Sequence, residues 1–262
     1  MPSSRRTQER AFAANLRVRV PRLRSIHEVV RIMEAIQALV GRQDGVWWFT
    51  ELYRRVTVSV DEACETRFFR YPEWMRCLVI EFAKLYFEAL ESWLAGRYRE
   101  CPPAWRVLFS RRLLLRKRGY SPLQFALAGV NAHIQRDLAF AAIRATKQYA
   151  GGKLSMDQVR GDYTRVNRIL EQVEVDAMRI MATGWIRALA DRVHPLDRFA
   201  AMQMIRVARA IAFQVGKAQL SLEGRAPRFA KALQTGVEWY AWFWGRVLLL
   251  PTYADGESGH MI

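Results

Sequence analysis

His133 and Asp137 are the pair of residues in this sequence best suited to chemistry. They stand four positions apart, and on an α-helix residues at that spacing share one face, so their side chains can touch. A carboxylate hydrogen-bonded to an imidazole fixes the tautomer of the ring and raises the basicity of its other nitrogen. The pair could therefore act as a general base or as part of a metal site.

The same pair also has a structural interpretation, in which it staples the helix or satisfies a partly buried polar group. Two small residues, Ala126 and Gly129, lie on the face that carries the pair. Small side chains there would leave room for a ligand beside the imidazole, and they would equally let another helix pack closely. The sequence leaves both interpretations open.

A second polar patch occupies residues 161–167, near the start of a long periodic segment. Its Asp162 falls on the apolar face of that segment, so we expect the carboxylate to point into the interior. A buried carboxylate needs a donor or a cation, and the candidates are His133, Arg165 and Asn131. Together with the pair formed by His133 and Asp137, it could complete a mononuclear metal site with an open position for water or substrate. The tight two-histidine spacing of many such sites is missing, and no spacing assigns a cofactor.

Short motifs across the chain carry a resemblance to one protein family. The matching pieces are Leu52-Tyr53, Val56-Thr57, Phe82, Tyr86, Pro102-Pro103-Ala104-Trp105, Asn131-Ala132-His133-Ile134 with Asp137-Leu138, Asp162-Tyr163 and Val166-Asn167. In these motifs the chain resembles an uncharacterised bacterial family of all-helical proteins, one of the families of unknown function. The resemblance implies a helical fold but no reaction and no substrate. The residues that it places at motif positions are His133, Asp137, Asp162 and Asn167.

These patterns predict a small-molecule site between helices. The residues expected to act in catalysis, or to bind a metal if one is present, are His133, Asp137 and Asp162. The residues expected to bind the ligand are Asn131, Tyr163, Arg165 and Asn167. The chain departs from the family pattern after Arg209, where the resemblance implies an acidic residue and this sequence has Ala210.

The elements that must position these residues are helices. Apolar residues recur at helical spacing in segment after segment, and no βαβ alternation or glycine-rich phosphate loop is visible. The predicted helices cover residues 23–40, 46–58, 72–93, 104–118, 122–149 and 155–180, and two more begin at Pro195 and Pro227. The sequence therefore predicts an all-α helix bundle of about seven to nine helices.

One domain is expected from the length of 262 residues and the apolar content of 51%. We expect a flexible basic arm over residues 1–20, a helical domain over 21–252 and a frayed tail over 253–262. The aromatic cluster at 239–244 is expected to belong to the core. Three cysteines without metal-ligand spacing, and the lack of a visible secretory signal or transmembrane segment, favour a cytoplasmic location.

The formal net charge of +16 leaves a second class of function open. The first hypothesis is a small-molecule enzyme that uses the histidine and aspartate pair as general acid and base or as a metal site. The alternative is a non-catalytic basic module that binds nucleic acid or an anionic membrane surface through the basic arm and the basic segment 104–118. An ordinary amphipathic surface helix would also explain that segment.

Overall fold

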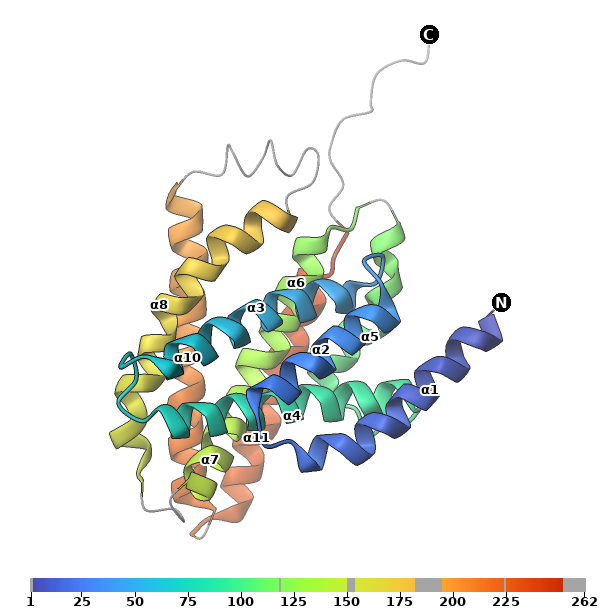
Figure 1. Ribbon diagram of the computed structural model, residues 1–262. Helices are drawn as coiled ribbons and strands as arrows, with labels where there is room; N and C mark the ends of the chain where they lie inside the picture. The colour runs from blue at the N-terminus through green and yellow to red at the C-terminus, as the bar shows by residue number, and fades with distance from the viewer. Residues whose placement is uncertain (1, 118, 150–153, 182–194, 224, 252–262) are drawn as a thin grey trace.

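Helices make up the architecture of the chain (Figure 1). The computed structural model describes residues 2–117, 119–149, 154–181, 195–223 and 225–251. The helices are α1 (Pro2–Arg19), η1 (Val20–Arg22), α2 (Ile26–Val40), α3 (Gly45–Glu65), α4 (Pro72–Leu94), α5 (Pro103–Arg111), η2 (Arg112–Arg116), α6 (Pro122–Ala132), η3 (His133–Asp137), α7 (Leu138–Gln148), α8 (Met156–Met181), α10 (Pro195–Leu222) and α11 (Pro227–Leu248). With α6, η3 and α7 counted as one interrupted rod, the described residues contain nine α-helices and no strand. The prediction of an all-α bundle is confirmed.

Local sequence signals set where many of these helices begin. Ser25 caps α2 and Ser121 caps α6, each in a capping box in which the side chain three residues later bonds back to the cap. Asp44 caps α3 by accepting a hydrogen bond from the Val46 N–H at 3.1 Å. Proline is the first residue of α4, α5, α6, α10 and α11, where its missing N–H removes no helical hydrogen bond.

Residues 2–19 form the helix α1, so the prediction of a flexible basic arm is wrong for this part of the chain. Ala13 and Leu16 are each 1% exposed, and α1 packs against α4. One of the arginines that suggested a solvated arm has acidic partners, since Arg5 contacts both Glu9 and Asp44 at 3.1 and 2.8 Å. Charge neutralisation along one side and apolar burial on the other hold the segment in place.

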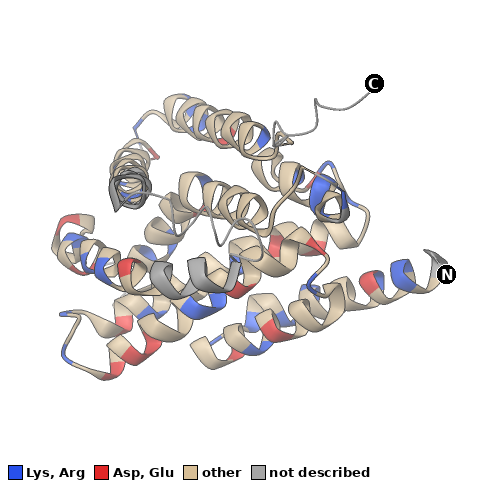
Figure 2. Cartoon of the chain, turned by 90° about the horizontal axis from the view of Figure 1, so that it is seen from above, with Lys and Arg blue, Asp and Glu red and all other residues tan. Residues whose placement is uncertain are grey.

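The basic segment 104–118 is likewise built into the bundle. It forms α5 followed by the 3-10 turn η2, and Trp105 and Leu108 of α5 are completely buried. Arg112 forms ion pairs with Glu9 and, at 3.5 Å, with Asp44. Figure 2 shows that basic residues are spread over many helices and are accompanied by acidic ones. The two elements of the proposed basic module, α1 and the segment that contains Arg112, are therefore joined to each other by an ion pair.

The core lies where the early helices cross the later ones. Figure 1 shows α1 to α4 running across the view, while α10 runs from top to bottom. The largest fully buried side chains include Trp74, Tyr86, Trp105 and Phe125. Within the described part of the chain, no helix is long and apolar enough to cross a membrane. The frayed tail predicted for residues 253–262 lies outside the described residues.

Most of the aromatic cluster at 239–244 lies outside the core, contrary to the prediction from its composition, and of its aromatic residues only Trp242 packs against the core. On α11 the exposed fractions are 61% for Trp239, 53% for Phe243 and 41% for Trp244. The buried side of the helix is formed instead by Ala230, Ala241 and Gly245. Composition indicated that the cluster is apolar but could not reveal which face of the helix the small residues would bring against the bundle.

Candidate active site

The candidate histidine and aspartate lie on a π-helical segment, η3, inserted between α6 and α7. The Leu138 N–H bonds to the carbonyl of His133, five residues earlier, whereas an α-helix bonds four residues back. The sequence predicted an uninterrupted helix over 122–149, and apolar periodicity alone does not reveal one wider turn. Single π turns within α-helices are rare and occur frequently at functional sites.

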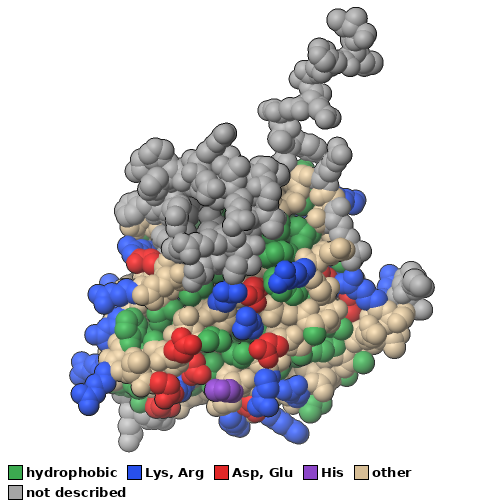
Figure 3. Space-filling model, turned by 45° about the horizontal axis from the view of Figure 1, so that its top comes forward, with side chains coloured by type: hydrophobic (Ala, Val, Ile, Leu, Met, Phe, Trp, Pro, Cys, Tyr) green, Lys and Arg blue, Asp and Glu red, His purple; other side chains and the backbone are tan. Residues whose placement is uncertain are grey.

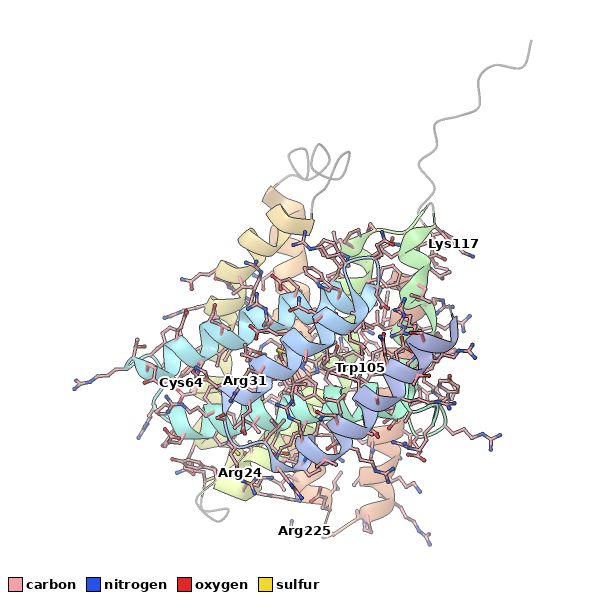
Figure 4. The ribbon with its side chains drawn as sticks, turned by 45° about the vertical axis from the view of Figure 1, so that its right-hand side comes forward. Arg24, Arg31, Cys64, Trp105, Lys117 and Arg225 are labelled. Atoms are coloured by element: carbon pink, nitrogen blue, oxygen red, sulfur yellow. The ribbon has the colours of Figure 1, made fainter. Side chains whose placement is uncertain are left out.

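Asp137 is completely buried and accepts three hydrogen bonds. Its Oδ2 accepts one from Trp105 Nε1 at 2.9 Å, and its Oδ1 accepts one from Arg136 Nη1 at 2.6 Å. The third comes from His133, whose Nδ1 lies 3.1 Å from Oδ2. An indole and a guanidinium only donate, so Asp137 serves them as an acceptor-only carboxylate. Figure 4 shows Trp105 among the helices, inside the bundle.

The imidazole of His133 is buried and neutral, and its tautomer follows from its partner. Because the carboxylate of Asp137 can only accept, Nδ1 carries the hydrogen and Nε2 carries the lone pair. Burial lowers the pKa of His133 below its usual value of 6.5, against the opposing effect of Asp137. The Nε2 atom is buried and has no hydrogen-bond partner within the described residues. The lone pair of Nε2 is thus a basic site that accepts no hydrogen bond from any described protein group.

Five aromatic rings surround this imidazole. Phe82 stacks on it with ring centroids 3.4 Å apart and an interplanar angle of 7°. The ring centroids of Tyr53 and Trp105 lie 4.4 and 5.8 Å away. Phe49 and Tyr86 present their rings at steep angles, at 5.6 and 6.3 Å. An apolar shell of this kind disfavours the charged imidazolium, which is the cause of the lowered pKa.

Two hydroxyl groups of α3 add hydrogen-bonding capacity beside the ring. The Tyr53 hydroxyl and the Thr57 Oγ1 are buried, and neither makes a hydrogen bond of acceptable geometry in the described part of the chain. Burial, followed by the charge of Asp137, raises the pKa of Tyr53 well above its usual value, although Thr57 acts in the opposite direction. Tyr53 is therefore a protonated hydroxyl that can donate, next to an imidazole that can accept.

The small residues near the pair serve helix packing. A Cβ atom added at Gly129 would fall on the ring of Phe49, and one added at Gly45 would fall on the ring of Phe125. Glycine at these two positions is what lets α3 and α6 approach each other. Of the two interpretations left open by the sequence, close approach of a second helix is the one that the structure supports at Gly129.

Asp162 is buried, as expected, but its partners are not His133 and Asp137, with which it was expected to form a metal site. Its carboxylate accepts hydrogen bonds from the backbone N–H groups of Arg70 and Tyr71 at 3.0 and 2.6 Å. Arg165 completes the set, with Nη1 2.9 Å from Oδ1. Asp162 thus fastens the loop before α4 to α8 and does not join His133.

A metal site built from the pair and Asp162 is not supported. Among the residues that the structure describes, no three His, Cys, Asp or Glu side chains are grouped in a way that could hold a metal ion. The hypothesis relied on a helical face to bring Asp162 inward, and that part was right. The position of the opposing loop, which no pattern in the sequence indicates, decides its partners.

Two of the four predicted ligand-binding residues, Tyr163 and Asn167, lie in a second cluster between α8 and α10. Tyr163 donates its hydroxyl to the Arg209 carbonyl at 2.6 Å, and the guanidinium of Arg209 donates to the Asn167 Oδ1 and the Tyr163 carbonyl, each at 2.8 Å. Asn131 donates to the Ala241 carbonyl of α11 at 2.6 Å. Arg165 is the exposed partner of Asp162. Each of these side chains has a structural partner, and none of these hydrogen bonds involves His133.

The comparison with protein families decides where the chain belongs. A family model described as a family of unknown function, DUF5995, matches residues 26–251. The chain belongs to this family. Searches of curated proteins and of solved structures found no match to the chain. The match covers every residue of the site and leaves its chemistry to be inferred from geometry.

Sequence reasoning overlooked part of the site in this DUF5995 protein. Tyr53 and Thr57 appear among the motif pieces but were given no role, although their spacing of four residues places them on one face of α3. Trp105 is also within a matching piece, and its indole is one of the donors that hold Asp137. A search for hydroxyl and indole groups at helical spacing within the motifs would have found them. Arg136, next to Asp137, carries no comparable signal.

Proposed function

We propose that this DUF5995 protein is a small-molecule enzyme in which His133 acts as a general base. The observation that carries the proposal is that His133 Nε2 is buried without a described hydrogen-bond partner, while the Tyr53 ring lies 4.4 Å from the imidazole and its buried hydroxyl interacts with Thr57. Buried polar groups are nearly always hydrogen-bonded, so the Nε2 atom is expected to take a ligand or water as its partner.

The roles follow from the hydrogen-bonding capacity of each group. His133 Nε2 accepts a proton from the ligand, and the Asp137 carboxylate stabilises the imidazolium that results. Tyr53, held protonated by its surroundings, donates a hydrogen bond to the ligand atom that gains negative charge. The proton then returns from Nε2 to the product, so that the enzyme is regenerated. Trp105 and Arg136 orient the carboxylate and touch no reacting atom.

The surroundings of the imidazole indicate the class of ligand. Phe82, Tyr53 and Trp105 offer ring faces and edges and bring no formal charge. The ligand is therefore expected to be small and mostly apolar, with one acidic hydrogen and one acceptor atom near each other. The alternative of a basic nucleic-acid or membrane module receives less support, because α1 and α5 pack into the bundle and Arg5 and Arg112 have acidic partners.

A ligand screen against matched variants tests the proposal. Thermal-shift screening of a small-molecule library identifies compounds that bind the wild-type protein, and calorimetry measures their affinity for the variants Tyr53→Phe and His133→Gln. Each variant removes one hydrogen bond to a buried ligand group, which is expected to weaken binding roughly 5- to 100-fold. The controls are Tyr98→Phe and His27→Gln, at exposed positions. Equal affinity of the hits for all five proteins would refute the proposed site.

A further inference from the structure

The outer side of α11 carries several exposed aromatic and aliphatic side chains. We define the aromatic face as Phe229, Trp239, Tyr240, Phe243, Trp244, Val247 and Leu250, all between 39% and 71% exposed. Steps of three and four between Tyr240, Phe243 and Val247 place them along one side of the helix. Exposed apolar surface of this extent on a folded chain marks a site of interaction.

The opposite side of α11 already provides the contacts that attach the helix to the bundle. Ala241 and Gly245 are buried there, and Asn131 donates a hydrogen bond to the Ala241 carbonyl. Arg136 binds Glu238 at 3.0 Å. The helix is thus fixed through its inner side, and the aromatic face points away from the part of the bundle that the structure describes.

The exposed charges on α11 are all positive. Its exposed ionic residues are Arg228, Lys231 and Arg246, and the guanidinium of Arg246 lies over the Trp242 ring at 5.1 Å. Glu238 is its one acidic residue, and Arg136 neutralises it. The face of the molecule seen in Figure 3 is different, because acidic and basic side chains lie beside each other there. The surface on α11 therefore combines aromatic groups with basic groups that have no acidic partner among the described residues.

We propose that the aromatic face of α11 docks on an anionic lipid surface. Tryptophan and tyrosine combine an apolar ring with a polar atom and prefer the boundary between lipid chains and water. Arg228 and Lys231 would contact the lipid phosphates while the rings enter the acyl boundary. A second copy of the chain is a poor occupant, since a two-fold interface would bring like-charged helices together in a protein of net charge +16. This inference does not rest on the chemistry of His133.

Vesicle flotation tests the docking surface. The full-length protein is mixed with vesicles of phosphatidylcholine alone or of phosphatidylcholine with phosphatidylglycerol. We expect binding to the anionic vesicles only, decreasing as salt is raised. The double variant Trp239→Ser, Phe243→Ser is expected to bind about tenfold or more weakly, because it removes two of the inserted rings. Its control, Val18→Ser with Leu113→Ser, changes two exposed apolar residues elsewhere and is expected to bind like the wild type.

Charge reversal provides the second arm of the test. Arg228→Glu with Lys231→Glu is expected to weaken binding by more than about tenfold, since each basic group near an anionic surface contributes to attachment. Arg19→Glu with Arg31→Glu gives the same net charge at exposed positions on α1 and α2 and is expected to have a much smaller effect. Absence of binding, equal binding to both vesicle types, or equal losses in both charge variants would overturn the proposal. The proposal would also be overturned if Trp239→Ser, Phe243→Ser abolished self-association or RNA binding of the protein but left vesicle binding unchanged.

Discussion

The indole of Trp105 and the carboxylate of Asp137 meet in the centre of the bundle, with Nε1 2.9 Å from Oδ2. That oxygen also accepts the hydrogen bond from His133. A group on α5 therefore fixes the acid that in turn fixes the orientation and tautomer of the imidazole on η3. The arrangement is that of a base whose second nitrogen is directed by a buried carboxylate.

Removing the indole donor tests this relationship. Trp105→Phe keeps an aromatic ring but leaves Oδ2 of the buried carboxylate with one donor fewer. We expect a loss of about 1.5–3 kcal/mol in the free energy of unfolding, measured with urea. Trp239→Phe, at a position that is 61% exposed, is the control and should stay within about 0.5 kcal/mol of the wild type. A Trp105→Phe protein as stable as this control would contradict the role given to the indole.

The lowered pKa of His133 predicts how stability depends on pH. Below pH 6.5 the unfolded chain protonates this histidine while the folded chain does not, so the unfolded state binds more protons. The contribution of His133 to stability is therefore complete above pH 6.5 and is lost as the pH falls through the lower folded pKa. In His133→Gln this part of the pH dependence should disappear.

The measurement is a set of urea unfolding curves between neutral and acidic pH, supported by imidazole ¹⁵N spectra. His27→Gln, at an exposed position, should keep the wild-type pH dependence. The spectra should show a protonated Nδ1 and an unprotonated Nε2 at neutral pH. A ring of His133 that gains its proton above pH 6.5 would contradict the geometry described here.

Asp162 is predicted to act in stability and not in ligand binding. Asp162→Asn replaces one carboxylate oxygen by an NH2 group, which cannot accept a hydrogen bond, so one of the backbone N–H groups of Arg70 and Tyr71 loses its acceptor. The expected loss is about 2 kcal/mol in unfolding free energy. The control Asp157→Asn removes an exposed ion pair with Lys217 and should have little effect. If Asp162→Asn lowers the affinity for the compounds found in the ligand screen as strongly as His133→Gln does, Asp162 belongs to the site after all.

Two glycine substitutions of the same type should have opposite signs. Gly129→Ala places a methyl group on the ring of Phe49 and is expected to cost about 1–3 kcal/mol in unfolding free energy. Gly161→Ala, within α8, meets nothing within 4 Å and is expected to stabilise by about 0.4–1 kcal/mol. Thermal or chemical unfolding measures both. Equal effects would show that the approach of α3 to α6 is looser than described.

The helices of this chain were predictable because their signals are local. Ser25 and Ser121 with the residues three positions later, and a proline at the start of six helices, indicate a boundary without knowledge of the rest of the fold. The first helix was missed because the acid that Arg5 binds at 2.8 Å, Asp44, is 39 residues away in the chain. An ion pair with a distant residue makes a basic segment look like a solvated arm.

The candidate site was predictable in part for the same reason. His133 and Asp137 are neighbours along one helix, so spacing alone brings them together. Asp162 was correctly predicted to be buried, but its partners lie in a loop about ninety residues earlier. Helical periodicity predicts which face of a helix is buried, but it does not predict which segment packs against that face. Tyr53 joins His133 through the packing of α3 on α6, which depends on Gly129.

A high-resolution crystal structure of the full-length protein above pH 6.5 tests the proposed base most directly. The decisive feature is the density next to His133 Nε2. The proposed function predicts an ordered water molecule or a bound small molecule within hydrogen-bonding distance of both Nε2 and the Tyr53 hydroxyl. An Nε2 atom hydrogen-bonded to a protein group, with the Tyr53 hydroxyl paired elsewhere, would show that the histidine and its aspartate only stabilise the fold.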